Sequence, residues 1–454
     1  MERNLEDLPT KAKKKKFGLR PVALSALSFL VVILIGSILL IMPFSLQEGV
    51  SINYLDALFT AVSCTCVTGL STVPLGVADT FSIAGRIIMT ILMQLGGLGV
   101  TFVAVLIFVV FSKRLSLSQQ SLIKENWNLI SLKNIRRIFL FICVITAINE
   151  LLGATLLFFD FLYLREMTPA RAVMFALFHS VSAYNNAGFD LFGTTSYIGF
   201  QTDYLLIFTT IFLIISGGLG YFTVFEIIHK KFNWGKSSLQ AKIVLVYTSV
   251  LIIVGTLGIY LMELSNSNTD ISFVGSIFTS VTTRTAGFTL YDLSQFKKAT
   301  LLLIMVFMYI GASPGGTGGG IKTTTFAIVA AYIRGLITDK KPHAFRRSVN
   351  KGLARTAMLI MTLSLSVFVF GMFLISLFEQ GQSFDLIDIA FETMSAFATV
   401  GLSTGITTSL SIGSKITLIF LMYIGRLGPL TLANSIKSRK NQTYSYVEEN
   451  VSIG

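Results

Sequence analysis

Charged residues are scarce in this chain. They make up 13% of its 454 residues, whereas soluble proteins average about 25%. Hydrophobic residues make up 53%, and the mean hydropathy is +0.74. This composition excludes a soluble globular protein, because so little polar surface cannot cover the core in water. Apolar runs of roughly 20 residues recur along the chain without strand-like alternation, which predicts an all-α polytopic membrane protein.

Cysteine and histidine are also rare, with three of each. The cysteines lie in apolar segments, which argues against a disulfide framework and predicts core packing; they are Cys64, Cys66 and Cys143. The histidines are scattered along the chain; they are His179, His229 and His343. Because no cluster of metal ligands or nucleophiles stands out, the chain is predicted not to be an enzyme, and a membrane-embedded enzyme is the weaker alternative.

Basic residues gather at the ends of the apolar runs. The net charge is +13, and its clusters lie within residues 11–20, 113–137, 230–242, 340–355 and 437–440. This is the positive-inside pattern, which assigns the clusters to the cytoplasm and argues against a nucleic-acid partner. Residues 1–20 are therefore predicted to be a cytosolic basic N-terminal segment and residues 441–454 a cytosolic tail, so the glycosylation sequon at Asn441 is discounted.

The five clusters divide the chain into four stretches, each of which must leave the inside and return. Each stretch holds two spans, and between them a shorter segment that begins with Phe and reaches a glycine nine or ten residues later. These segments are FTAVSCTCVTGLST (59–72), FHSVSAYNNAGFDL (178–191), FTSVTTRTAGFTL (278–290) and FETMSAFATVGLST (391–404). The recurrence is an internal repeat. It predicts four tandem units over residues 21–112, 113–233, 234–340 and 341–440.

The returning span of each unit has a glycine-rich middle. The four stretches are QLGGLGV (94–100), SGGLGY (216–221), MYIGASPGG (308–316) and MYIGRLGP (422–429). The spans are predicted near residues 22–44, 81–111, 138–162, 204–229, 241–263, 300–333, 355–378 and 414–436.

The short segments are predicted to be re-entrant loops around a common axis. Unpaired backbone groups in lipid cost several kcal/mol each, so such loops persist only inside protein or beside a water-filled path. Glycine allows positive φ and lets an ion approach carbonyl oxygens, which then replace its hydration shell. Close helix packing is the alternative for any single glycine, but the fourfold recurrence favours a selectivity filter. The predicted filter residues are Val67, Thr68, Gly69, Asn186, Ala187, Gly188, Thr285, Ala286, Gly287, Thr399, Val400 and Gly401.

These four triads resemble the degenerate pore-loop signatures of the Trk/Ktr/HKT superfamily of potassium transporters, over essentially the whole chain. The resemblance implies four span–pore-loop–span units around a central pore, like a potassium channel folded from one chain. Members with serine at the first filter position tend toward sodium, so four glycines imply K⁺ at Gly69, Gly188, Gly287 and Gly401. The first unit directly follows the basic cluster, which favours a Ktr-type (KtrB-like) membrane subunit over Trk-type members with extra N-terminal spans.

The stretch GASPGGTGGG (311–320) interrupts the returning span of the third unit. Each glycine in a helix costs about 1 kcal/mol relative to alanine, and non-helical backbone at membrane depth must line a cavity. The resemblance implies an intramembrane gating loop over residues 311–325. The predicted gating residues are Gly311, Gly315, Gly316, Gly318, Gly319, Gly320, Lys322 and Arg426. A phosphate-binding loop is excluded, because Ile321 stands between the last glycine and the lysine and no strand precedes it.

Arg426 occupies the place of Gly97 and Gly218 in the first two units. A charge within a span is a functional hypothesis by default, so Arg426 is predicted to be a barrier to permeation near the gating loop. A structural ion pair and snorkelling stay open as alternatives.

Other charges in predicted membrane segments carry less information. Arg284 lies in the third pore loop and is predicted to brace the loops through a carboxylate, with Glu392 and Glu150 as the two partners considered. Asn185 and Asn186 are predicted to hydrogen-bond across loops or to line the outer mouth.

The resemblance also implies the assembly. It implies a homodimer and a cytosolic RCK/KTN-type nucleotide-binding regulatory subunit (a KtrA-like ring), docked around residues 112–137, 230–242 and 335–355; topology alone is the plain alternative for these basic loops. The predicted location is the plasma membrane, with both termini cytoplasmic and no organic cofactor in the chain. The alternatives are a Na⁺-permeable or Na⁺-coupled transporter of the same fold, and a secondary carrier. Inverted repeats would mark a carrier, whereas all four units here begin and end inside.

Overall fold

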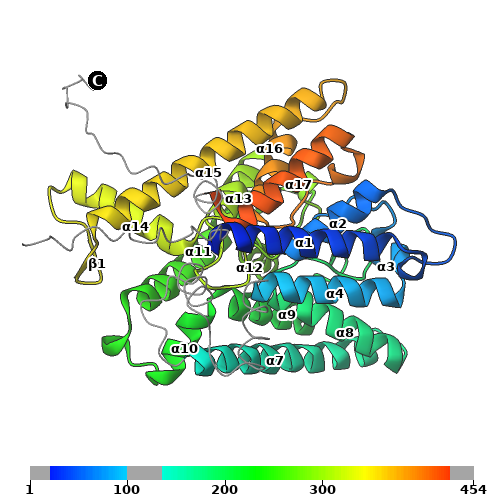
Figure 1. Cartoon of the computed structure of the whole chain (residues 1–454), viewed down its shortest axis with the longest axis horizontal. Coiled ribbons are helices and arrows are strands. Elements are labelled where there is room, and N and C mark those ends of the chain that lie inside the picture. Colours follow the sequence, from blue (N-terminus) through cyan, green and yellow to red (C-terminus); the bar gives the residue numbers. More distant parts are fainter. Residues whose placement is uncertain (1–20, 100–134, 430–454) are drawn as a thin grey trace, which may run out of the picture.

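The computed structural model describes residues 21–99 and 135–429, which are almost entirely helical (Figure 1). One pattern occurs four times: a long helix, a short helix that ends near a glycine, and a returning helix. The first helices of the units are α1 (Pro21–Ile41), α7 (Ile135–Phe159), α11 (Leu239–Glu263) and α15 (Lys351–Phe378). The short helices are α2 (Tyr54–Cys66), α8 (Pro169–Tyr184), α12 (Phe273–Thr282) and α16 (Leu386–Ala398). The returning helices are α4 (Ile83–Leu98), α9 (Tyr204–Gly218) with α10 (Tyr221–His229), α13 (Lys298–Tyr309) with α14 (Thr323–Ile337), and α17 (Ile412–Leu427).

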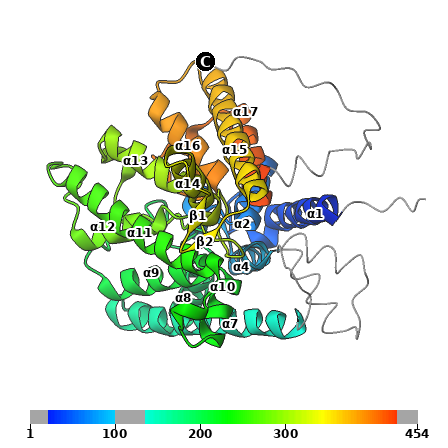
Figure 2. The same ribbon diagram turned by 90° about the vertical axis from the view of Figure 1, so that its left-hand side faces the viewer.

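The four units follow one another around a common centre, as the view in Figure 2 shows by the sequence of colours. Each returning helix packs against the short helix of the next unit: α4 against α8, α9 against α12, and α13 against α16. The last returning helix, α17, closes the circle by packing against α2 of the first unit. The fourfold repeat of the sequence therefore becomes a closed arrangement in space.

Several described helices are long and apolar enough to cross a membrane. They are residues 137–164, α11 and α15, and the bent pair α9–α10 makes a fourth if it counts as one span. Their outward side chains are large and apolar; examples are Leu151, Leu261 and Phe370, at 62%, 66% and 63% exposure. Such a surface suits lipid and not water, so the predicted all-α membrane fold is confirmed.

Helix starts are fixed by side-chain caps. In six of the α-helices that the structure describes, a Ser, Asp or Asn side chain accepts a hydrogen bond from a backbone N–H in the first turn, which satisfies a group that the helix leaves unpaired. These N-caps are Ser82 (α4), Asp203 (α9), Ser238 (α11), Ser272 (α12), Asn350 (α15) and Ser411 (α17).

In the third and fourth units, a buried carboxylate connects the first helix to the returning helix. Glu263, at the end of α11, accepts hydrogen bonds from Lys297 N at 3.0 Å and from the Thr300 hydroxyl. Glu379, just after α15, accepts from Ser411 N at 2.8 Å. The same device therefore joins the end of the first helix to the start of the returning helix in both units.

In the returning spans predicted near 81–111, 204–229 and 414–436, a helix bends or ends at the glycine-rich middle. α9 and α10 meet at an angle of 91°, so residues 204–229 form two helices with a sharp bend at the glycine-rich middle. The physical reason is a Leu-Gly step whose glycine, Gly220, has a φ of +86°, outside the helical range. α4 and α17 end at the same step, where Gly99 and Gly428 have φ of +88° and +85°. The remainders of the two other predicted spans, residues 100–111 and 430–436, lie outside the described residues.

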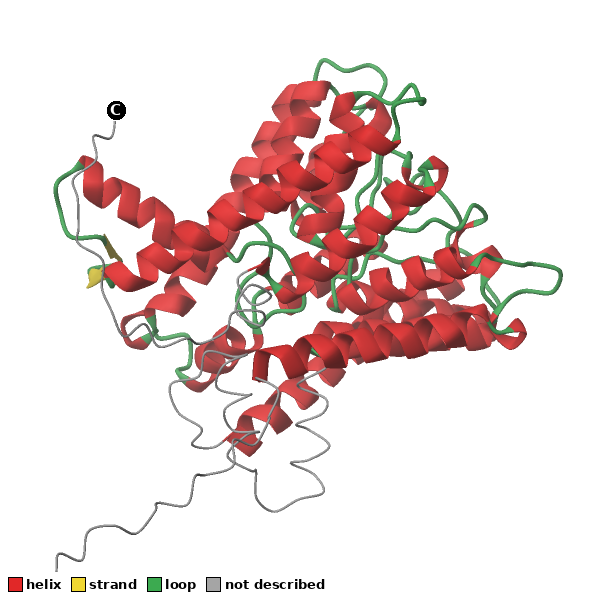
Figure 3. Cartoon of the chain, turned by 45° about the horizontal axis from the view of Figure 1, so that its top comes forward, coloured by secondary structure: helices red, strands yellow, loops and turns green. Residues whose placement is uncertain are grey.

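Short elements complete the described chain. Strands β1 (His343–Ala344) and β2 (Arg347–Ser348) form an antiparallel hairpin between α14 and α15, with His343 opposite Ser348. Figure 3 shows these strands at one end of the molecule, while most of the loops gather at the other. The remaining short helices are η1 (Pro43–Ser45), α3 (Gly76–Thr80), η2 (Asp160–Leu164), η3 (Trp234–Lys236), η4 (Leu293–Gln295) and η5 (Thr407–Ser409).

The core lies between the short helices and their neighbours. It is built from apolar side chains of all four units, including Phe59, Phe178, Phe278 and Phe391, the first residues of the four repeated segments. The cysteines are free; Cys64 and Cys66 are buried in the core and Cys143 packs against it. Their predicted packing role is confirmed.

Candidate functional site

Each short helix ends in the same strained turn. The residue two positions before the glycine has a left-handed backbone in all four units: φ is +59° at Val67, +57° at Asn186, +76° at Thr285 and +51° at Thr399. A non-glycine residue in this region costs about 1–2 kcal/mol. Four instances at equivalent positions show that the turn is imposed by the fold, and strain of this kind gathers at functional sites.

The four glycines after these turns meet one another. We call Gly69, Gly188, Gly287 and Gly401 the ring glycines; their φ values are +100°, +70°, +83° and +94°. A Cβ on Gly69 would lie 2.7 Å from the Ala187 oxygen, and one on Gly188 would lie 2.9 Å from the Ala286 oxygen.

The contacts continue around the circle. A Cβ on Gly287 would lie 2.6 Å from the Val400 oxygen, and one on Gly401 would approach the Thr68 oxygen more closely still. Each ring glycine thus touches the backbone of the next unit, and the fourth touches the first. This closed ring brings four carbonyl groups together, those of Thr68, Ala187, Ala286 and Val400.

Serine hydroxyls hold these turns from behind. Ser63 and Ser395 accept hydrogen bonds from the N–H groups of Gly69 and Gly401, both at 3.1 Å. In the second unit Ser182 accepts from Phe189 N at 3.0 Å. Sequence reasoning missed these residues, although a serine four positions after the leading Phe in three of the four segments was a visible signal. These serines occupy backbone donors, and no backbone N–H within residues 21–99 and 135–429 bonds to the carbonyl oxygens of Thr68, Ala187, Ala286 and Val400.

The glycine-rich stretch lies directly against the ring turns. A Cβ on Gly318 would overlap the Thr285 hydroxyl, and a Cβ on Gly319 would overlap that of Thr399. No larger residue fits at either place without a shift. The stretch between α13 and α14 is not helical, and an isolated β-bridge joins Ile310 at its start to Ile321 at its end. The break predicted in this span is therefore present.

The bend between α9 and α10 anchors this loop. Ser313 and Thr317 donate from their backbone N–H groups to the carbonyls of Gly218 and Gly217, at 3.1 and 3.3 Å. Tyr221 N donates to Gly315 O at 2.9 Å. The broken helix of the second unit therefore supplies the hydrogen-bonding groups that the loop of the third unit needs.

Two cationic side chains clamp the loop. Lys322 donates from Nζ to the carbonyls of Gly318 and Gly319, at 2.7 and 3.3 Å. Arg426, in the last turn of α17, donates to the carbonyls of Thr317 and Gly96. The guanidinium thus joins the loop of the third unit to the returning helix of the first.

The predicted ion pairs of Arg284 are not formed. Glu392 accepts from the hydroxyls of Ser403 and Thr407, the latter at 3.0 Å, and Glu150 accepts from Asn185 Nδ2 at 3.2 Å. Arg284 forms neither an ion pair nor a side-chain hydrogen bond within residues 21–99 and 135–429. The prediction was wrong because local hydroxyl and amide donors satisfy both carboxylates.

The two asparagines do bond across loops. Asn185 Nδ2 donates to Gln94 Oε1 at 2.7 Å, and Asn186 Nδ2 donates to Thr285 Oγ1 at 3.3 Å. The first bond links the second unit to the first, and the second links it to the third.

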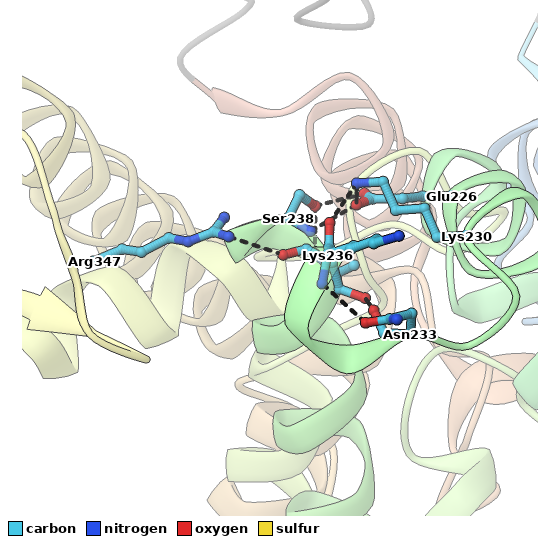
Figure 4. A network of polar contacts seen from close by, with 8 residues as sticks. Glu226, Lys230, Asn233, Lys236, Ser238 and Arg347 are labelled. Carbon is cyan, nitrogen blue, oxygen red and sulfur yellow. Dashed lines mark hydrogen bonds and ion pairs between the residues drawn. The ribbon is translucent and has the colours of Figure 1, made fainter.

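A polar network orders the loop between α10 and α11, at the end of the molecule where the hairpin lies (Figure 4). Glu226 accepts from Lys230 Nζ at 2.5 Å and from Ser238 N at 2.6 Å. Arg347 of strand β2 donates to Ser237 O at 3.1 Å. Two of the basic loops that the sequence assigns to the cytoplasm therefore form one connected surface.

Apolar helices that enclose a ring of free carbonyl oxygens define a membrane protein built for cation transport. Comparison with known families agrees: the family model "Cation transport protein", TrkH, matches residues 24–444. The chain belongs to the TrkH family of cation transport proteins.

Relatives of this chain match over nearly its whole length. It is 39% identical over 442 residues to the Ktr system potassium uptake protein B of Vibrio alginolyticus, covering 94% of each chain. It is 35% identical over 453 residues to the potassium/sodium uptake protein NtpJ of Enterococcus hirae, covering 97% of this chain and 99% of the relative. The crystal structure of the potassium transporter TrkH from Vibrio parahaemolyticus shares the fold, with a TM-score of 0.69 at 18% identity, over 94% of this chain and 87% of that one.

Proposed function

We propose that this chain is the ion-translocating subunit of a potassium uptake system. The observation that carries the proposal is the closed ring in which each ring glycine touches the backbone of the next unit. The carbonyl oxygens of Thr68, Ala187, Ala286 and Val400 would take the place of water around a dehydrated K⁺. The names of the relatives, which are potassium uptake proteins, support the choice of ion.

In this proposal the filter comprises residues 67–69, 186–188, 285–287 and 399–401, with K⁺ bound at the ring glycines. The ion would enter from outside, shed water at the ring and then meet the loop 311–325. The membrane potential favours inward movement of a cation by about 2.3 kcal/mol per 100 mV, so uptake needs no chemical step.

The loop 311–325 is proposed to be the gate. Its backbone lies against the Thr285 and Thr399 side chains beneath the ring, where it would obstruct an ion. Lys322 and Arg426 hold the loop by its carbonyl oxygens and place two positive charges on the ion path. Opening would require these hydrogen bonds to break.

The assembly is proposed to include two copies of this chain in the plasma membrane, with both termini in the cytoplasm. A cytosolic RCK/KTN-type subunit is the proposed regulator, since relatives are named as parts of Ktr systems. The surface that joins the α10–α11 loop to the hairpin is its proposed docking site, because two basic side chains are fixed there: Lys230 by Glu226 and Arg347 by the Ser237 carbonyl.

Sodium is the second candidate ion. One relative is named a potassium/sodium uptake protein. The alternative function to test is therefore K⁺ uptake that depends on Na⁺.

The test is uptake by purified protein in liposomes, measured with radioactive rubidium as the K⁺ tracer, with and without Na⁺ outside. Each ring glycine is changed to serine in turn. Rubidium uptake by the wild type that K⁺ inhibits more strongly than Na⁺, and that the serine variants lose, is the expected result. A wild-type protein that carries Na⁺ as readily as K⁺ would refute the assignment.

A further inference from the structure

The third residue before each ring glycine fills the space behind its turn. The four residues at this position are Cys66, Asn185, Arg284 and Ala398. Asn185 and Ala398 pack against glycines of the preceding unit: a Cβ on Gly97 would overlap the Asn185 side chain, and one on Gly320 would lie 3.6 Å from the Ala398 Cβ. A glycine on one unit thus makes room for a side chain on the next.

Arg284 holds the equivalent position in the third unit but brings a charge. It and Gly218 of the second unit line one small cavity. Gly218 has almost nothing near its missing Cβ, only Asn186 Nδ2 at 3.5 Å. The Asn185 amide fills the space beside Gly97, whereas the space beside Gly218 stays open as part of the cavity that Arg284 also lines.

No ion pair involves this guanidinium within residues 21–99 and 135–429. Asn185 is bonded to Gln94 and Glu150, whereas Arg284 is only 8% exposed and its Nε lies buried without an acceptor. The cavity that it lines measures about 10 Å³, room for about one water. Two further buried oxygens at this cavity, Asn186 Oδ1 and Thr248 Oγ1, also lack a partner. No carboxylate is among the lining residues.

Arg284 lies next to the ring. Its neighbour in sequence is Thr285, the left-handed residue of the third turn, and Asn186 of the second turn shares its cavity. The ring order places Arg284 at the boundary of the second and third units. Arg426 lies at the diagonally opposite boundary, where its neighbours include Gly96 of the first unit. An unpaired buried charge is felt strongly over such short distances, because little water screens it.

We propose that Arg284 sets the cation affinity of the ring: its uncompensated positive charge behind the third turn weakens the binding of every permeating cation. This inference rests on the proposed function. A charge that repels from behind the ring does not distinguish ions by size, so it should change the affinities for K⁺ and Rb⁺ by the same factor. A residue that merely shaped the turn would change their ratio.

The test measures half-saturation for K⁺ and Rb⁺ in liposomes with the variants Arg284→Gln, Arg284→Met and Arg284→Lys. Both neutral variants are expected to lower the two half-saturation constants by about tenfold, the order expected for unit charges roughly 10 Å apart inside a protein. Arg284→Lys is expected to match the wild type. Arg171→Gln, which removes an exposed arginine of α8, is the control and should change neither constant.

A second pair of variants keeps the arginine and changes Thr248, which lines the same cavity. Thr248→Asp puts a carboxylate of nearly the same size at the cavity, and it should lower both constants as Arg284→Gln does. Thr248→Asn adds no charge and should not. This pair keeps the proposal testable if the Arg284 variants fail to fold.

Unchanged half-saturation in Arg284→Gln, in Arg284→Met or in Thr248→Asp would overturn the proposal, and so would equal shifts in Arg284→Lys and Arg284→Gln. A change in the K⁺/Rb⁺ ratio would also overturn it. If the wild-type protein carries no K⁺ at all, the proposed function fails instead, and the two failures are distinguishable.

Discussion

Replacing Gly401 with alanine tests the ring most severely. Gly401 has a φ of +94°, and an added Cβ would overlap the Thr68 carbonyl oxygen and lie 3.0 Å from the Cα of Gly69. The substitution therefore carries two penalties. The backbone region is unfavourable for alanine, at about 1–3 kcal/mol, and the clash must displace an oxygen of the proposed filter.

Gly405 separates these penalties. It lies four residues later in the same loop with nearly the same φ, +95°, and an added Cβ would meet nothing within 4 Å. Gly405→Ala should therefore carry only the free-energy cost of the unfavourable backbone conformation. The overlap at Gly401 should add about 1–3 kcal/mol, the usual cost of forcing atoms into a packed site. That difference corresponds to roughly a 5- to 150-fold effect.

The assay is potassium-limited growth of an uptake-deficient host, followed by tracer flux in liposomes at matched protein amounts. Gly401→Ala should lower flux at low K⁺ by roughly 5- to 150-fold relative to Gly405→Ala. The four ring positions should also be graded, with Gly401→Ala the most severe and Gly188→Ala the mildest, because a Cβ on Gly188 keeps 2.9 Å from its nearest neighbour. Equal flux in the Gly401 and Gly405 variants would refute the reasoning.

Three further substitutions test the support around the ring. Ser395→Ala leaves the half-buried Gly401 N–H without its acceptor. The melting temperature and the preference for K⁺ over Na⁺ should both fall, at a cost of about 1–3 kcal/mol. Exposed Ser409→Ala is the control, and equal melting of the two variants would contradict the role. Arg426→Gln removes the guanidinium that holds Thr317 O. Ion flux should rise by about tenfold for each 1.4 kcal/mol by which the closed loop is destabilised. The surface variant Lys298→Gln is the control with unchanged flux, and unchanged flux in Arg426→Gln at unchanged expression would reject a barrier role for Arg426. Glu226→Gln weakens the hydrogen bonds to Lys230 and Ser238. Amide hydrogen exchange in residues 230–238 should become faster while α11 stays protected. Unaltered exchange in residues 230–238 would contradict the role of Glu226 in ordering this loop.

The sequence predicted the local features of this fold well. The four Phe-to-glycine segments correspond to the ends of α2, α8, α12 and α16, because a repeated pattern within 14 residues is visible without any long-range information. The same is true of the break after α13, since six glycines within residues 311–320 cannot continue a membrane helix.

The features that failed depend on tertiary contacts. The 91° bend after Gly218 was hidden, because a glycine within an apolar run has the same signature whether it packs against a helix or takes positive φ. The partners of Arg284 were also beyond the sequence. Charge alone pairs it with Glu392, but nearby hydroxyls from Ser403 and Thr407 occupy that carboxylate first.

The most direct measurement is to locate a heavy potassium analogue in the protein. Crystals or frozen grids prepared in Rb⁺ or Tl⁺ should show density on the axis between the carbonyl oxygens of Thr68, Ala187, Ala286 and Val400, and the Gly401→Ala variant should lose it. Density that is absent from this ring in the wild type, or that lies only at the surface, would contradict the assignment of these turns as the ion path.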